Sequence, residues 1–117
     1  MLKRVMLIED DLDAAFMLQQ NLSRAGYDVD CLNEGNLIVE RRFPLPDIFI
    51  LDNGLPTING IALCKYLKLQ PDLKDIPILV ISANYDIRDK AYNAGATAFL
   101  NKPFAIQEIL NCLRTLK

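Results

Sequence analysis

The sequence contains no histidine, and its cysteines are few. Without histidine, the protein lacks the usual general base and the commonest ligand of transition metals. The three cysteines, Cys31, Cys64 and Cys112, form no CxxC pair. Their odd number fits reduced thiols packed in or near a core better than a disulfide framework. Any chemistry therefore has to depend on carboxylates, hydroxyls and lysine.

The sequence also lacks long apolar runs and an excess of positive charge. Its apolar runs are far shorter than the roughly 18 residues that a membrane-spanning helix needs. Lys3 and Arg4 are followed by Glu9 too soon for a signal peptide. Thirteen lysines and arginines against fifteen acidic residues give a net charge of -2. We therefore expect a cytoplasmic protein with neither a membrane nor nucleic acid as a direct partner.

The length and the order of the segments predict the fold. A chain of 117 residues is long enough for one domain, 1–117, that buries roughly two thirds of its unfolded surface. Apolar runs typical of buried strands alternate with segments of helical spacing. Strands are expected at 5–8, 27–31, 48–51, 78–81 and 97–100. Three helices are expected at about 12–25, 35–42 and 60–70. A fourth helix is expected to end at Gly95, and a fifth to begin at about residue 106.

Several residues predict where these helices begin, end and face the core. Asp11 is expected to cap the first helix, and Gly26 and Gly95 are expected to end the helices before them. Two prolines after Arg42 are expected to stop the second helix. The buried faces of the last two helices are expected to contain Ile87, Ala91 and Ala94, and then Ile106, Ile109, Leu110 and Leu113.

An alternating order of strands and helices predicts an α/β fold with a parallel sheet. We expect a doubly wound (βα)5 flavodoxin-like fold with strand order 2-1-3-4-5 and helices on both faces. The period-2 segment at 27–31 suits an edge strand. In this topology the first and third strands are neighbours, so Glu9, Asp10 and Asp52 meet at their carboxyl ends. Ser82 and Lys102 follow the fourth and fifth strands at the same edge.

The chemistry of this acidic edge favours a metal ion and a phosphoryl group. Carboxylates about 5 Å apart repel by roughly 3 kcal/mol per pair at an effective dielectric constant near 20. Hard oxygen ligands without histidine or thiolate favour Mg²⁺. Asp52 is the best-placed nucleophile for an aspartyl phosphate. Lys102 would neutralise phosphoryl charge, and the Ser82 hydroxyl would hydrogen-bond a phosphoryl oxygen.

These motifs together resemble those of the receiver domain of two-component response regulators, and the resemblance covers the whole chain. That family has an acidic pair after the first strand, a phosphoacceptor after the third, Ser or Thr after the fourth and Lys-Pro after the fifth. The matching residues here are Glu9-Asp10, Asp52, Ser82 and Lys102-Pro103, within the segments 51–56, 82–83 and 95–104.

The resemblance implies a role for each residue of the site. Asp10 and Asp52 would bind Mg²⁺ directly, Glu9 would bind it through water, and the main-chain carbonyl of Gly54 would be a further ligand. Ser82 would move to the phosphoryl group while the ring of Phe99 turns inward. The Lys102-Pro103 peptide bond is expected to be cis.

The resemblance also implies partners and leaves some properties open. A sensor histidine kinase or phosphotransfer protein would supply the phosphoryl group. A downstream effector would read the surface of the fourth helix, fifth strand and fifth helix, which is also a candidate for dimer contacts. The protein would be a switch and not an enzyme, apart from its own phosphorylation and dephosphorylation. Gly54 and Asn84 occupy positions that modulate phosphoryl lifetime in the family, and Phe99 replaces the tyrosine that is also common there.

The same residues also have simpler interpretations, and other functions are compatible with the fold. Taken singly, Ser82 would be a turn residue, Lys102 a solvated lysine and Phe99 a core aromatic, and Pro56 and Gly60 are interpreted as structural. A receiver-like interaction module that works without phosphorylation is the main alternative. A nucleotide or flavin binder would need a Gly/Ser/Thr-rich loop where this chain has the acidic segment 9–13. The sequence ends with the last expected helix, so we expect either a stand-alone regulator or a piece of a larger one.

Overall fold

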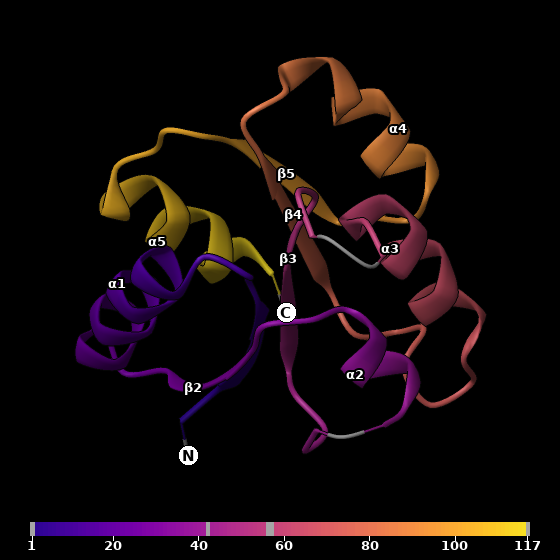
Figure 1. Ribbon diagram of the computed structural model, residues 1–117. Helices are drawn as coiled ribbons and strands as arrows, with labels where there is room; N and C mark the ends of the chain where they lie inside the picture. The colour runs from indigo at the N-terminus through magenta and orange to yellow at the C-terminus, as the bar shows by residue number, and fades with distance from the viewer. Residues whose placement is uncertain (1, 42, 56–57, 117) are drawn as a thin grey trace.

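The computed structural model describes residues 2–41, 43–55 and 58–116. Figure 1 shows a sheet between two layers of helices, with α1 and α5 on one side and α2, α3 and α4 on the other. The predicted helix cover on both faces is therefore confirmed. Expectations that concern Arg42 and Pro56 lie outside the described residues.

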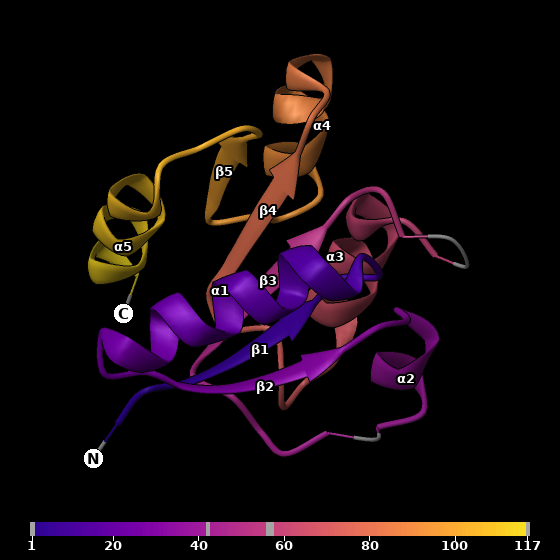
Figure 2. The same cartoon turned by 60° about the vertical axis from the view of Figure 1, so that its left-hand side comes forward.

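The sheet has five parallel strands in the order β2-β1-β3-β4-β5, as the sequence predicts. This order can be followed from one edge of the sheet to the other in Figure 2. The strands are β1 (Arg4–Ile8), β2 (Asp28–Leu32), β3 (Ile48–Asp52), β4 (Ile78–Ser82) and β5 (Ala98–Asn101). β3 is the central strand, and the segment predicted as an edge strand forms β2.

The helices follow the strands in turn. They are α1 (Leu12–Arg24), α2 (Asn36–Val39), α3 (Gly60–Leu69), α4 (Arg88–Asn93) and α5 (Ile106–Thr115), and a 3-10 turn, η1 (Tyr85–Ile87), precedes α4. Among the described residues, no helix is long and apolar enough to cross a membrane.

Alternating side chains of the strands form two cores, one on each face of the sheet. In β3, for example, Phe49 and Leu51 pack toward α3 and α4, whereas Ile48 and Ile50 pack toward α1 and α5. Every residue of β3 and β4 is buried. A strand that is covered on both faces reads as a continuous apolar run, which is why these two strands could be located from the sequence. The three cysteines are free thiols, one buried and two half-buried.

The predicted helix ends are confirmed at three positions. The side chain of Asp11 accepts hydrogen bonds from the N–H groups of Asp13 and Ala14 at 3.0 and 3.3 Å, which caps α1. Gly26 and Gly95 follow α1 and α4 with φ angles of 99° and 107°. This left-handed conformation costs a glycine little and other residues more, so both glycines suit a helix stop.

Two expectations about the helices need correction. The second helix spans only Asn36–Val39, because Arg41 adopts a φ of 60° and turns the chain before the prolines are reached. The guanidinium of Arg41 is held there by two hydrogen bonds to Asp72, at 2.7 and 3.0 Å. Ile106 is exposed at the first turn of α5, while Ile109 and Leu113 are buried as expected and Leu110 is half-buried.

Candidate functional site

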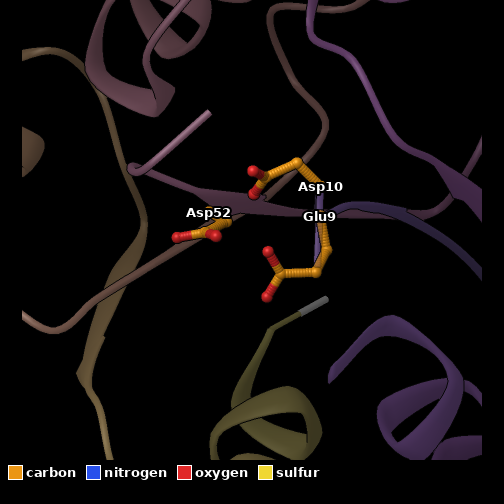
Figure 3. A group of neighbouring side chains, drawn as sticks. All are labelled: Glu9, Asp10 and Asp52. Carbon is orange, nitrogen blue, oxygen red and sulfur yellow. The ribbon is translucent and has the colours of Figure 1, made fainter. Parts of the chain in front are cut away.

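Three carboxylates meet at the carboxyl edge of the sheet. Glu9 and Asp10 directly follow β1, and Asp52 is the last residue of β3. Each of the three residues offers a carboxylate oxygen, and these oxygens all lie within 4.8 Å of one another. Figure 3 shows the three side chains reaching toward a common space. Glu9 and Asp52 are buried, at 1% and 6% exposure, whereas Asp10 is exposed.

The surrounding main chain fixes the position of Asp52. The Gly54 N–H donates a hydrogen bond to its Oδ1 atom at 3.1 Å. Gly60, the first residue of α3, packs directly behind it: a Cβ atom there would lie 3.1 Å from the Asp52 carbonyl oxygen and 3.0 Å from the Asn53 Cα. Asn59 caps α3 by accepting a hydrogen bond from the N–H of Ala62. The start of α3 therefore abuts the strand end that carries Asp52.

Lys102 connects two of the carboxylates. Its Nζ atom lies 3.2 Å from Oε1 of Glu9 and 3.4 Å from Oδ2 of Asp52. The lysine side chain is 31% exposed, so it is partly accessible from outside while it contacts the two buried acids. The Lys102-Pro103 peptide bond is cis, as expected.

The ionisation of these groups reflects burial and their mutual contacts. Burial, a hydrogen bond to Asp52 and the negative charge of Asp52 raise the pKa of Glu9 to about 7. Burial also disfavours the charged form of Asp52, but hydrogen bonds from Glu9 and the Gly54 N–H, together with Lys102, hold its pKa below the ordinary value. Burial opposes the charge on Lys102, yet the two acids outweigh it and raise the pKa of Lys102. A carboxylate held ionised in this way could act as a nucleophile.

Ser82 lies at the end of β4 and is 5% exposed. Its Oγ atom accepts a hydrogen bond from the Asn84 N–H at 3.0 Å. Its carbonyl oxygen accepts two more from β5 and the residue after it, from Asn101 Nδ2 at 2.9 Å and the Lys102 N–H at 2.8 Å. The structure therefore gives Ser82 the turn-forming contact of the simpler interpretation, while its hydroxyl proton can still be donated.

Phe99 lies on β5, opposite Val80 in the register of the sheet. The ring is half-buried and packs against the core on the α3 and α4 side. It also meets the ring of Tyr85 edge to face, with centroids 6.2 Å apart. Phe99 thus packs against the core, as the simpler interpretation expects, but its ring is only half-buried.

The donor set fits a hard divalent cation. Three carboxylates within 4.8 Å of one another supply only oxygen ligands, and Mg²⁺ and Ca²⁺ are the ions that prefer such ligands. A single ammonium group shared by Glu9 and Asp52 leaves the cluster with excess negative charge. This acidic cluster could therefore bind a metal ion.

The structure brings together the residues that the sequence placed at one edge. The predicted carboxylates form one cluster, Glu9, Asp10 and Asp52. Lys102 contacts Glu9 and Asp52, and the Gly54 N–H donates a hydrogen bond to Asp52. Sequence reasoning missed two neighbours, Asn101 and Tyr85. The side chain of Asn101 could have been placed near Ser82 from the pairing of β4 with β5. The contact of Tyr85 with Phe99 depends on the η1 turn, which the sequence analysis does not predict.

A doubly wound parallel sheet with an acidic cluster at its switch point defines an α/β protein of the flavodoxin-like class. Residues 5–114 match the family model of the response regulator receiver domain. The chain is 34% identical to the DNA-binding dual master transcriptional regulator RpaA of Synechocystis, over 97% of this chain and 48% of that protein. It is also 34% identical to the response regulator MprA of a Mycobacterium strain, over 97% and 50%. The chain belongs to the response regulator receiver domain family, and it spans about half the length of these curated relatives.

Solved structures agree with the fold. A crystal structure of a response regulator from Chloroflexus aurantiacus matches with a TM-score of 0.92 and 31% identity, covering 98% of this chain and 97% of that one. The response regulator TrrA of Thermotoga maritima, solved in complex with Mg²⁺ and BeF, matches with a TM-score of 0.89 and 24% identity, covering 99% and 100%. The second likeness concerns the fold alone.

Proposed function

We propose that this protein, as a single receiver domain over 1–117, is the phosphoacceptor switch of a two-component phosphorelay, with Asp52 as the residue that is phosphorylated. The observation that carries the proposal is the meeting of Asp52 with Glu9, Asp10 and Lys102 at one edge of the sheet. A buried, ionised carboxylate beside a metal-binding cluster and an ammonium group has what an aspartate nucleophile needs.

The reaction transfers a phosphoryl group from a phosphohistidine of the donor protein. An oxygen of Asp52 attacks phosphorus, the P–N bond of the phosphohistidine breaks, and the freed imidazole nitrogen takes up a proton. The ammonium group of Lys102 stabilises the negative charge that builds up on the phosphoryl oxygens. A bound Mg²⁺ would neutralise phosphoryl charge, and Asp10, Asp52, the Gly54 carbonyl and, through water, Glu9 would hold it. Attack of water on phosphorus later returns the free carboxylate and inorganic phosphate.

The switch uses the serine at the end of β4 and the aromatic residue within β5. The Ser82 hydroxyl donates a hydrogen bond to a phosphoryl oxygen on Asp52, and the ring of Phe99 turns further into the core. This changes the surface formed by α4, β5 and α5, where we place contacts with a downstream effector or a second copy of the chain. The catalysis is limited to the protein's own phosphorylation and dephosphorylation.

An apolar rim beside the acidic cluster supports a macromolecular phosphodonor. A cavity of about 570 Å³ between α1 and the start of α5 is lined by Glu9 and Lys102 on one side and by Met17, Phe104 and Ile106 on the other. In this lining, Met17 of α1 and Ile106 of α5 are 64% and 37% exposed. Exposed apolar side chains in such a group are typical of protein-binding surfaces. A histidine kinase or phosphotransfer protein docked there would hold its phosphohistidine close to Asp52.

The proposal is tested by incubating the protein with Mg²⁺ and a small acyl phosphate and measuring the intact mass. We expect one added phosphoryl group on the wild type and none on the Asp52→Asn variant. An unmodified wild type, or equal modification of the variant, would refute the proposal. A protein that binds its partners equally well with and without a phosphoryl analogue would instead favour a receiver-like interaction module.

A further inference from the structure

Tyr85 and Asn84 connect Ser82 to Phe99 by a route outside the sheet. We infer that Tyr85 is a positioning residue that holds Phe99 in its half-buried state, and that the Ser82–Asn84 hydrogen bond keeps Tyr85 in place until the Ser82 hydroxyl moves. The inference rests on the proposed function, which it deepens by naming the contact that keeps the unphosphorylated switch at rest.

The connection begins at the side chain of Ser82. Its Oγ atom accepts the Asn84 N–H at 3.0 Å. The side chain of Asn84 in turn accepts the Asp86 N–H at 3.0 Å and so caps the η1 turn. Tyr85 is the first residue of η1, and its ring meets Phe99 at 6.2 Å with an angle of 78° between the rings. Two hydrogen bonds and one ring contact thus link the serine hydroxyl to the aromatic ring on β5.

The main chain of Ser82 is fixed more firmly than its side chain. Asn101 Nδ2 and the Lys102 N–H both donate to its carbonyl oxygen, at 2.9 and 2.8 Å. The hydroxyl has one hydrogen bond to the loop, from the Asn84 N–H. Rotation of the hydroxyl toward Asp52 therefore leaves the end of β4 in place and breaks the contact with Asn84. The segment that is released is the η1 turn.

The ring contact opposes the inward movement of Phe99. Tyr85 is 61% exposed, and its ring packs against the ring of Phe99, which is half-buried against the core. Edge-to-face packing of this kind favours the arrangement in which both rings stay in contact. If Phe99 moves into the core, it leaves Tyr85. Removing the Tyr85 ring should therefore shift the population toward the inward state.

Beryllofluoride binding in the presence of Mg²⁺ measures this shift. We expect the Tyr85→Ala variant to bind the analogue about 2- to 10-fold more tightly than the wild type, the range that corresponds to one aromatic pair. Tyr85→Phe, which keeps the ring, should bind like the wild type. Tyr92→Ala is the matched control, because Tyr92 lies under the Arg88 guanidinium on α4 and not against Phe99.

A second measurement needs no analogue. Fluorophenylalanine labelling gives one ¹⁹F resonance for each of the five phenylalanines, and Phe99→Leu assigns the signal of Phe99. Without ligand, that signal should move in Tyr85→Ala and stay in Tyr92→Ala. In Ser82→Ala, which lacks the hydroxyl, it should move in the same direction, and the Asn84 amide should exchange about tenfold faster.

The outcomes separate the two ideas. No response of the wild type to beryllofluoride would overturn the proposed function and this inference with it. Two outcomes would overturn this inference alone. The wild type and Tyr85→Ala could bind beryllofluoride with equal affinity, or the ¹⁹F signal of Phe99 could stay unchanged when the Tyr85 ring is removed.

Discussion

Replacing Glu9 with glutamine should change how the stability of the metal-free protein depends on pH. Glu9 is 1% exposed, and its pKa rises from 4.5 to about 7 on folding. A carboxyl group whose pKa is raised in the folded state binds its proton more tightly there than in the unfolded chain. Its contribution to stability is therefore complete below about pH 4.5 and is lost as the pH rises through about 7.

The size of the effect follows from the pKa difference. Each pKa unit corresponds to about 1.4 kcal/mol, so the ionisation of Glu9 should remove about 3 kcal/mol of stability between about pH 4.5 and pH 8. The Glu9→Gln variant has no such proton to lose. In chelator, urea unfolding should show the wild type losing that amount relative to Glu9→Gln over this range. Mg²⁺ should reduce the difference, since it favours the ionised carboxylate.

The control is Asp75→Asn, which removes the charge of an exposed acidic residue between α3 and β4. It should follow the pH profile of the wild type. Parallel profiles for the wild type and Glu9→Gln in chelator would refute the reasoning, because they would mean that Glu9 ionises as easily in the folded protein as in the unfolded chain.

Three further predictions concern single positions. Gly95→Ala should lower the free energy of unfolding by about 1–3 kcal/mol, because φ is 107° and the new Cβ would lie 2.6 Å from Lys68 Cγ. Thermal unfolding measures this loss of stability, and an unchanged melting temperature would contradict the prediction. Asp11→Ala should cost about 1 kcal/mol through loss of the α1 cap, whereas Asp11→Asn should cost little in the same urea titration. A Cβ at Gly54 would lie 3.7 and 3.9 Å from the two carboxylate oxygens of Asp52. A leucine side chain there should hinder access of water to the phosphoryl group, so Gly54→Leu should slow hydrolysis of the aspartyl phosphate. Phosphate release as fast as in the wild type would argue against this.

The sheet could be predicted from the sequence because its strands have a simple physical signature. A strand covered on both faces is typically a continuous apolar run, and β3 and β4 are apolar up to their last residues, Asp52 and Ser82. Asp11, Gly26 and Gly95 marked helix ends for reasons local to the chain: a side chain that caps N–H groups, or a backbone that tolerates positive φ. The acidic residues and the lysine came together because parallel strands bring their carboxyl ends to one edge.

Local patterns failed where a distant contact decided the outcome. The second helix is short because Arg41 takes a left-handed conformation and binds Asp72, which lies 31 positions further along the chain. Ile106 fits an apolar stripe, yet it is exposed on the rim of the cavity beside Lys102. Helical spacing alone does not reveal which turn of a helix extends beyond the core.

By itself, the sequence determined the fold class, the strand order and which side chains share one edge of the sheet, since these follow from burial periodicity and from the connection rules of parallel strands. Only the tertiary structure decided how that edge works. It buries Glu9 beside Asp52, and burial and Asp52 raise the pKa of Glu9 to about 7 against the opposing effect of Lys102. It also ties the Ser82 hydroxyl to Asn84 and sets Tyr85 against Phe99. Distances and burial set these properties, and both depend on residues that lie far apart in the chain.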